Sequence, residues 1–231
     1  MDQQEYWRNF WLEHTQDLSN KDEQTQVLRT RNKQPIDEAT WQYTLESVRK
    51  QLELKSSDTI LDLCCGNGLF SVAFAPFVRS VDAVDLSPRL IDSISARKIS
   101  NIRAEAKDIR ELSFKDGAFT KVLWYAGIQY IDESDIVSMI RRIRKWMKPG
   151  GILFLGDVPD RSKLWDYFNE PTREKAYFDG IEQKRPVIGS WLDKYWLEKL
   201  FRSAGFAEAR AIPQDETLIY SDFRYDLIAK L

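Results

Sequence analysis

The segment Ile60–Ser71 carries the residue types best suited to chemistry in this chain. An apolar run that contains Asp62 ends at a loop with two glycines, Gly66 and Gly68, and an amphipathic segment follows at once. Glycine has no Cβ, so the backbone can turn sharply there and a ligand can lie against it. The N–H groups at the start of the following helix would point at the same spot. The pattern predicts the strand, turn and helix that open a nucleotide-binding α/β sheet.

Acidic residues at successive strand ends separate two classes of nucleotide ligand. A dinucleotide loop has a third glycine where this chain has Ser71. Asp85 follows Gly66 by 19 positions (85 − 66) and suits the ribose hydroxyls of any adenosine ligand. At the mouth of the loop, Asp62 would repel a pyrophosphate but would attract an ammonium group and a sulfonium. Asp108 is placed to accept a hydrogen bond from an adenine amine. The three acids favour S-adenosylmethionine over NAD.

Five short motifs, in order and at suitable spacing, resemble those of class I S-adenosylmethionine-dependent methyltransferases that act on small molecules. They are the glycine loop 62–68, the strand end 84–88, the acidic segment 106–109, the strand 119–126 and the turn 148–153. The likeness runs from about residue 60 to 155 and resumes from 191 to the C-terminus. One departure is Cys64, which stands where the family has its first loop glycine.

The resemblance implies S-adenosylmethionine as the cofactor and places its binding residues along these motifs. The expected set is Asp62, Cys64, Gly66, Asn67, Gly68, Asp85, Leu86, Asp108, Ile109, Tyr125 and Ala126. The only cysteines, Cys64 and Cys65, are neighbours inside the loop, where small packing residues are a better interpretation than a nucleophile or a metal ligand. The sequence predicts no metal site.

The expected fold is α/β. Hydrophobic periodicity predicts strands near 59–64, 81–86, 101–106, 119–125, 150–156, 206–212 and 222–230. It predicts helices near 68–77, 88–98, 133–147 and 191–204. The resemblance implies a Rossmann-like, mostly parallel sheet of seven strands in the order 3-2-1-4-5-7-6, with strand 7 antiparallel and helices on both faces. Residues 55–231 would form this domain.

Two segments lie outside the predicted core and are expected to cover the site. Residues 1–54 form an N-terminal helical extension, and a second, aromatic-rich insertion spans about 157–190. Four large aromatics at helix spacing (Tyr6, Trp7, Phe10 and Trp11) precede a polar stretch without glycine. The sequence therefore predicts that residues 1–35 form a mobile lid that orders when cofactor binds. Arg29 or Arg31 would then reach the cofactor carboxylate.

Methyl transfer chiefly requires donor and acceptor to be held in line, so a catalytic residue cannot be assigned from sequence. The candidates are His14, Tyr125, Gln129 and Asp157. The predicted reaction moves a methyl group to an O, N or C atom of a small metabolite by in-line displacement. The alternatives are an aminopropyl transferase on the same scaffold, an NAD-dependent oxidoreductase, or a binding protein that keeps the fold without catalysis.

Composition limits the partners and the compartment. The 231 residues include 34 basic and 36 acidic ones, giving a net charge of −2. Mixed charges of this kind argue against dedicated binding to nucleic acid or to membranes. No apolar run approaches the ~20 residues that span a bilayer, and two adjacent cysteines fit a reducing compartment. The sequence therefore predicts a cytoplasmic monomer or homodimer with a small-molecule acceptor.

Overall fold

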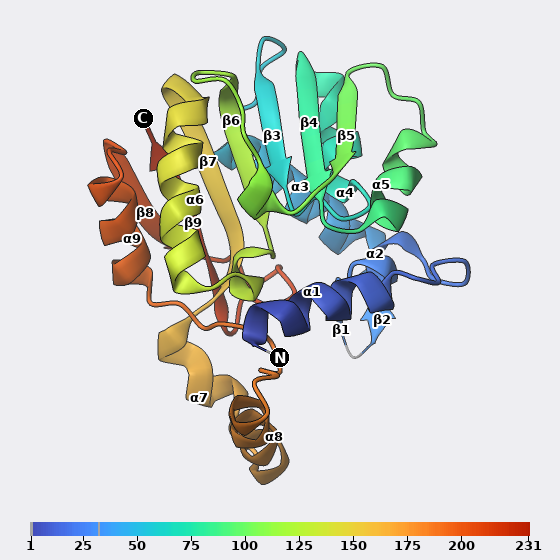
Figure 1. The fold of residues 1–231 in the computed structure, drawn as a ribbon, viewed down its shortest axis with the longest axis vertical. Coiled ribbons are helices and arrows are strands. Elements are labelled where there is room, and N and C mark those ends of the chain that lie inside the picture. The colour runs from blue at the N-terminus through green and yellow to red at the C-terminus, as the bar shows by residue number, and fades with distance from the viewer. Residues whose placement is uncertain (1, 32) are drawn as a thin grey trace.

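A seven-stranded sheet forms the centre of the molecule (Figure 1). The computed structural model describes residues 2–31 and 33–231. The strands lie in the order β5-β4-β3-β6-β7-β9-β8, and β9 runs antiparallel to both of its neighbours. This confirms the predicted order. The strands are β3 (Thr59–Leu63), β4 (Ser80–Asp85), β5 (Ile102–Ala106), β6 (Phe119–Tyr125), β7 (Met147–Pro159), β8 (Glu208–Pro213) and β9 (Arg224–Lys230).

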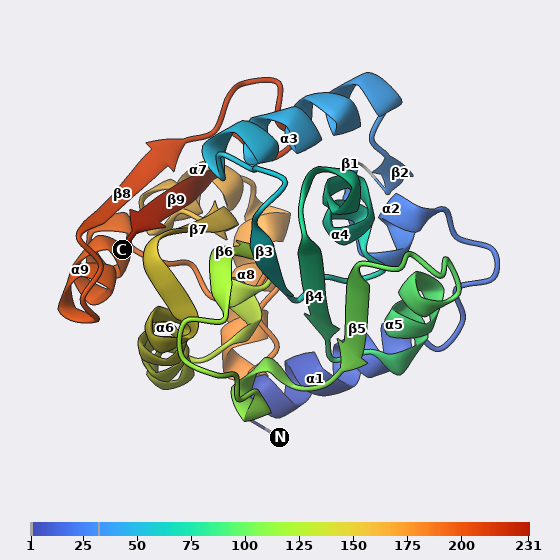
Figure 2. The ribbon, with the colours of Figure 1, turned by 90° about the horizontal axis from the view of Figure 1, so that it is seen from above.

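Alternation along the buried strands assigns helices to the two faces of the sheet (Figure 2). In β6, Val122 and Trp124 pack in one hydrophobic cluster, and Leu123 and Tyr125 pack in the other. The first cluster includes α6 (Glu133–Trp146) and α9 (Lys194–Ser203), and the second includes α3 (Glu38–Gln51), α4 (Leu69–Phe74) and α5 (Pro88–Ser95). Because both faces are covered, the central strands read as nearly continuous apolar runs.

Strand β7 is longer than predicted because its pairing continues beyond an irregularity. Leu155 pairs with Leu227 and Val158 with Tyr225, so the register shifts between these two pairs. Asp157 lies in the shifted stretch with φ +64°, in the left-handed region. A bulge of this kind changes the direction of a side chain without ending the strand.

The N-terminal segment crosses the edge of the sheet at which the parallel strands end. Helix α1 (Gln3–His14) lies beneath this edge in Figure 1, followed by α2 (Glu23–Gln26) and the short antiparallel pair β1 (Thr30–Arg31) and β2 (Gln34–Pro35). Helix α3, by contrast, packs in the core of the domain through Trp41, Val48 and neighbours. Residues 1 and 32 of the predicted lid lie outside the described part of the chain.

The insertion after β7 forms α7 (Leu164–Tyr167) and α8 (Pro171–Glu182), which project below the sheet in Figure 1. It has a small core of its own around Leu164, Phe168 and Trp191. Since β7 continues to Pro159, the projecting part begins later than the predicted residue 157. No helix of the described residues is long and apolar enough to cross a membrane.

Candidate active site

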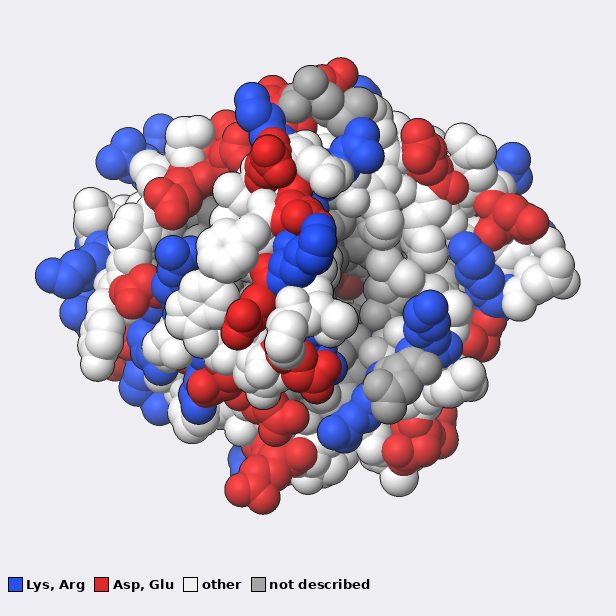
Figure 3. All heavy atoms as spheres, turned by 90° about the horizontal axis from the view of Figure 1, so that it is seen from below, with Lys and Arg blue, Asp and Glu red and all other residues white. Residues whose placement is uncertain are grey.

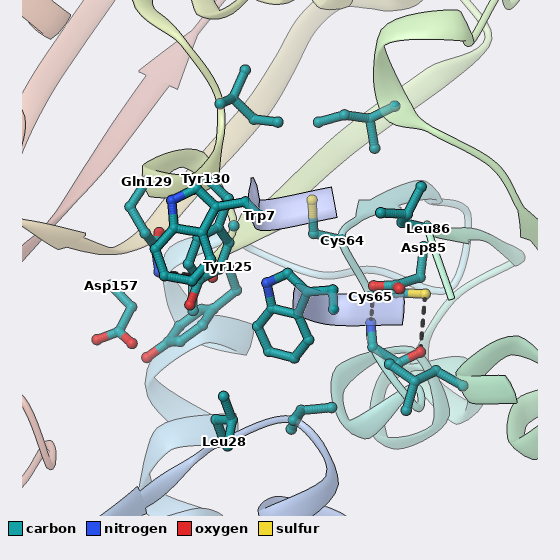
Figure 4. A pocket seen from close by; sticks show the side chains of 18 of the residues that line it. Trp7, Leu28, Cys64, Cys65, Asp85, Leu86, Tyr125, Gln129, Tyr130 and Asp157 are labelled. Carbon is teal, nitrogen blue, oxygen red and sulfur yellow. Dashed lines mark hydrogen bonds between the residues drawn. The ribbon is translucent and has the colours of Figure 1, made fainter. Parts of the chain in front are cut away.

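A cavity lies where the parallel strands end, between the sheet and the N-terminal segment. Its walls come from α1, residues 27–29, loop residues 64–67, 69 and 70, the ends of β4 and β6, residues 108–110, the segment 126–131 after β6, and Asp157. The C-terminal segment adds Tyr220 and Arg224. Figure 4 shows Asp85, Leu86 and Cys65 gathered on one side of this cavity, and Trp7, Tyr125, Gln129, Tyr130 and Asp157 on the other. These two sides are called the cofactor end and the acceptor end below.

The two loop glycines, Gly66 and Gly68, have different structural roles. Gly66 lines the cavity with φ +59°, and a Cβ there would lie 2.6 Å from Cγ1 of Val27, which also lines the cavity. Gly68 has φ +83°, but a Cβ there would lie 2.8 Å from Cγ1 of Ile94 in α5. Gly68 is not among the residues that line the cavity. Gly66 therefore lines the cavity, and Gly68 allows α4 and α5 to pack closely, while the predicted cofactor contact of Gly68 stays a prediction.

Asp62 lies behind the loop and does not line the cavity. Its side chain is 2% exposed, and Ser71 Oγ donates to its Oδ2 over 2.5 Å. Burial raises the pKa of Asp62 to about 7. In this structure Asp62 ties the strand end to the first turn of α4 through Ser71. Its predicted contact with the cofactor stays a prediction.

Asp85 presents a carboxylate to the cofactor end. Gly66 N donates to Oδ2 and Ser87 N donates to Oδ1, each over 2.9 Å. Burial raises the pKa of this carboxyl group. Each carboxylate oxygen accepts more than one hydrogen bond, so capacity remains for a pair of ligand hydroxyls. The arrangement fits the ribose of an adenosine ligand.

Asp108 is already engaged by a neighbouring guanidinium. Arg110 donates from Nε to Oδ1 over 2.9 Å and from NH2 to Oδ2 over 2.6 Å. Burial raises the pKa of Asp108, but the hydrogen bonds from Arg110 outweigh it and the pKa is lowered. Arg110 also donates to Gln4 of α1 and lies 3.5 Å from Asp135 of α6. An adenine amine at Asp108 would therefore share this carboxylate with Arg110, which links α1 to the domain.

The acceptor end has aromatic walls and one ion pair. The rings of Trp7 and Tyr130 lie 4.6 Å apart, and Trp7 is only 5% exposed. Burial raises the pKa of Tyr125 and Tyr130, the latter to about 12, so both phenols are neutral at physiological pH. Asp157 Oδ2 accepts from Arg224 NH1 over 2.8 Å.

Arg29 is a buried cation without a carboxylate partner in the described part of the chain. It is 8% exposed, and its guanidinium lies 4.6 Å from the ring centroid of Tyr125 and 5.1 Å from that of Trp41. Within the described residues, no carboxylate oxygen lies within 4.0 Å of it. Buried charges in proteins are normally paired, so this one indicates an anionic group of a ligand. Arg31, the other sequence candidate, is exposed and lies outside the cavity lining.

His14 does not reach the cavity. Its Nε2 contacts Gln26 O over 3.1 Å, and its ring stacks on Phe10. Burial lowers the pKa of His14. The structure therefore separates this candidate from the other three, Tyr125, Gln129 and Asp157, which all line the acceptor end.

The remaining predicted residues lie in the cavity wall, together with several that sequence reasoning did not single out. Cys64, Asn67, Leu86, Ile109 and Ala126 all line the cavity. Burial raises the pKa of the Cys64 and Cys65 thiols well above the usual value, so both are protonated and poor nucleophiles at physiological pH. The residues not foreseen include Arg8, Val27, Leu28, Phe70, Arg110, Tyr220 and Arg224. Among the described residues, no cluster of His, Cys, Asp and Glu could hold a metal ion.

Residues 22–29 form a strap over the glycine loop. Asn67 Nδ2 donates to Glu23 O over 2.8 Å and to Gln26 Oε1 over 2.9 Å. Thr15, at the end of α1, shares a 2.7 Å hydroxyl contact with Ser87 beside the cofactor end. The N-terminal segment thus closes the cavity by direct contacts with the residues that build it.

Comparisons with known proteins agree with this geometry. Residues 60–151 match the family model described as a methyltransferase domain. Demethylmenaquinone methyltransferase of Staphylococcus saprophyticus is 25% identical over 188 residues, 74% of this chain and 78% of that protein. The chain is a class I S-adenosylmethionine-dependent methyltransferase.

Solved structures of such methyltransferases share the fold. A Leishmania major S-adenosylmethionine-dependent methyltransferase superposes with a TM-score of 0.68 at 10% identity, over 97% of this chain and 83% of that one. Phosphoethanolamine N-methyltransferase 2 of Haemonchus contortus, solved with phosphomonomethylethanolamine and S-adenosylhomocysteine, gives 0.63 at 16% identity, over 83% and 52%. The cofactor of this methyltransferase is S-adenosylmethionine.

Proposed function

We propose that this methyltransferase transfers the methyl group to an O, N or C atom of a small metabolite that occupies the acceptor end. The observation that carries the proposal is a covered cavity with an adenosine-type carboxylate, Asp85, at one end and neutral phenols, an amide and an ion pair at the other. The relatives named above act on a quinone precursor or a phosphobase, according to their names. Both are small molecules.

The cofactor assignments follow the contacts at the cofactor end. Asp85 would accept the two ribose hydroxyls, with Leu86 and Ile109 as apolar neighbours of the adenine. The methionine part would lie along Gly66 and Ala126. The side chain of Asn67 donates hydrogen bonds to the strap that covers the methionine part. Its role in cofactor binding is therefore to hold this strap in place.

Arg29 would bind the carboxylate of the methionine part. A guanidinium matches a carboxylate with two parallel hydrogen bonds, and Arg29 is the buried cation of the cavity that lacks a carboxylate partner among the described residues. The strap therefore contributes a ligand-binding residue as well as a cover.

In the reaction the protein binds the cofactor and the acceptor, orients their reacting groups and excludes water from them. When bound, S-adenosylmethionine supplies an electrophilic methyl group. Trp7 and Tyr130 close the acceptor end and keep the reacting groups dry. Tyr125, Gln129 and Asp157 are the groups placed to orient the acceptor, and Asp157 can hold a proton that the acceptor releases.

The other candidate functions lack support from the site. An aminopropyl transferase requires acids after the fourth strand to hold a polyamine, and residues 124–131 contain none. A dinucleotide loop requires a close helix approach at the third glycine position, where Ser71 is instead bonded to Asp62. A binding protein without catalysis does not explain a closed acceptor end that adjoins the cofactor end.

Titration calorimetry tests the proposal. S-adenosylhomocysteine should bind and NAD should not. Asp85→Ala should weaken S-adenosylhomocysteine by at least tenfold, since each hydrogen bond to a charged group contributes about 1.5–3 kcal/mol. Asp82→Ala is the matched control, because Asp82 lies on the same strand and faces exposed Arg103 at 3.4 Å, away from the cavity. Equal affinities for the two variants would contradict the assignment.

The finer organisation is also a proposal. Residues 1–54 act as an extension and cover, and residues 55–231 form the methyltransferase domain with its insertion. Acidic and basic side chains are interspersed over the described atoms of the face below the sheet (Figure 3). This mixture and the net charge of −2 support a cytoplasmic monomer or homodimer that binds neither nucleic acid nor membranes.

A further inference from the structure

Two opposite charges face each other at the acceptor end. Asp157 and Arg224 form an ion pair at 2.8 Å, with side chains 5% and 10% exposed. The other buried cation nearby is Arg29, which the proposed function assigns to the cofactor carboxylate. Burial raises the pKa of the neighbouring Asp226 to about 7, which favours its neutral form. With the cofactor carboxylate at Arg29 and Asp226 neutral, the charges of Asp157 and Arg224 leave no net charge for a second ligand.

Hydrogen bonds from Gln214 and to Asp226 hold Asp157 in place and leave Asp157 Oδ1 able to accept a further bond. Gln214 Nε2 donates to Asp157 Oδ1 over 3.2 Å and to Asp226 Oδ1 over 2.8 Å. Asp157 N donates to the same Asp226 oxygen over 2.8 Å. Among the described residues, Asp157 Oδ1 accepts a single hydrogen bond, the long one from Gln214, and Asp157 lines the cavity at the β7 bulge. Its free lone pairs accept a hydrogen bond from a ligand.

The walls around this carboxylate are flat rings. Trp7 and Trp11 of α1 lie 4.6 Å and 5.5 Å from the ring centroid of Tyr130, and Tyr125 continues the surface towards Arg29. Rings of this kind pack best against another flat apolar surface. Figure 4 shows Trp7, Tyr125 and Tyr130 together beside Gln129 and Asp157.

We propose, on the basis of the proposed function, that the methyl acceptor is an uncharged planar molecule that donates a hydroxyl or N–H hydrogen bond to Asp157. An anionic acceptor would meet the Asp157 carboxylate, to which Arg224 NH1 is bonded. The buried Arg224 Nε has no partner among the described residues, and it can donate to the oxygen of a neutral acceptor without bringing a second negative charge next to Asp157. A cationic acceptor would lie beside Arg224, Arg29 and the positive methyl donor. A neutral ring with a donor group meets none of these penalties and satisfies Asp157 Oδ1.

The hydrogen bond from the acceptor to Asp157 also gives the proton released in the reaction a place to go. For a hydroxyl acceptor, the oxygen forms the new bond to the methyl carbon, and the sulfur keeps the electron pair of the broken C–S bond. The O–H bond breaks and its proton passes to Asp157, then to solvent. Asp157 is therefore a candidate catalytic residue that touches the acceptor, and Arg224 and Gln214 are its positioning residues.

Three probes with one ring test the charge preference. Protein saturated with S-adenosylhomocysteine is titrated with 4-ethylphenol (neutral), tyramine (cationic) and 4-hydroxyphenylacetate (anionic) by ligand-observed NMR. The neutral probe should bind at least tenfold more tightly than either ion. Equal or tighter binding of an ion, or no binding of 4-ethylphenol, would overturn the proposal. Calorimetry on the same sample reports S-adenosylhomocysteine binding, whose loss would instead contradict the proposed function.

Charge-changing variants test the role of the ion pair. Asp157→Asn leaves Arg224 unpaired, so the preference should move to 4-hydroxyphenylacetate and 4-ethylphenol should weaken about tenfold. Arg224→Met leaves Asp157 unpaired and should favour tyramine, and it serves if Asp157→Asn does not fold. Asp160→Asn is the control, because Asp160 is 5% exposed and ion-paired with Lys194 but lies outside the cavity lining. Unchanged preferences in both test variants would refute the role of Asp157.

Discussion

Arg29 gives the sharpest test of how the strap contributes to cofactor binding. Arg29→Met keeps the length and apolar character of the stem and removes the guanidinium. In the free protein the loss of ring contacts at 4.6–5.6 Å is offset by the removal of a buried charge that has no carboxylate partner among the described residues. We therefore expect the free energy of unfolding without ligand to change by less than about 1 kcal/mol.

Ligand binding should respond much more strongly. Two hydrogen bonds between charged groups contribute together on the order of 3 kcal/mol, which corresponds to a roughly 100-fold weaker Kd for S-adenosylhomocysteine. The assay is calorimetry with S-adenosylhomocysteine and with its decarboxylated analogue. The analogue lacks the group that Arg29 binds, so its affinity should be nearly the same in both proteins.

Arg31→Met is the matched control, because Arg31 is exposed and outside the cavity lining. If Arg29→Met weakened both ligands equally, the guanidinium would serve the shape of the strap and not the carboxylate. If neither ligand were affected, the buried charge would have another counter-ion.

Three further tests address the loop, the buried acids and the cover. Gly66→Ala should weaken the binding of S-adenosylhomocysteine at least tenfold, because the added Cβ faces the strap. Gly68→Ala should lower the free energy of unfolding by about 2 kcal/mol with an unchanged Kd, because the added Cβ faces α5. The reverse pattern would contradict these separate roles of the two glycines. Burial raises the pKa of Asp226 to about 7, so the native state favours the neutral acid, and the stability that this provides is lost as pH rises from about 4 to 7. In urea unfolding, the free energy of unfolding of Asp226→Asn should fall by on the order of 3 kcal/mol less than that of the unchanged protein over this pH range. Equal pH dependence of the free energy of unfolding in the two proteins would refute this prediction. Tryptic cuts between Lys21 and Lys33 should slow when S-adenosylhomocysteine is added, and equal rates would make the segment a fixed scaffold.

The order of the sheet could be predicted because the motifs resemble those of class I methyltransferases. The central strands could be placed because each reads as a separate apolar run with turns between. In β6 the residues Val122 and Trp124 alternate with Leu123 and Tyr125, and both sets are buried. The length of β7 could not be predicted. Its pairing past the shifted register depends on β9, which follows more than sixty residues later, and no local pattern marks the continuation to Pro159.

At the site, local patterns identified the backbone turn and the carboxylate of Asp85 but not the direction of every side chain. Ile60 and Asp62 share a strand face by alternation, and Ile60 packs in the cluster that contains α4. Asp62 therefore points towards Ser71 and not into the cavity. Arg224 was missed because it enters the site through the pairing of β7 with β9, which no motif near Arg224 indicates.

The cavity is completed by segments that a methyltransferase core alone would not provide. Val27 covers Gly66, Arg29 supplies a buried cation that no described carboxylate pairs with, and Trp7 closes the acceptor end. Ligand and strap therefore stabilise each other: an anion at Arg29 removes the cost of its buried charge, and the covered loop keeps the ligand from water. Because this coupling is reciprocal, any substitution that loosens the strap from Asn67 should weaken cofactor binding even though the substituted residue does not touch the cofactor.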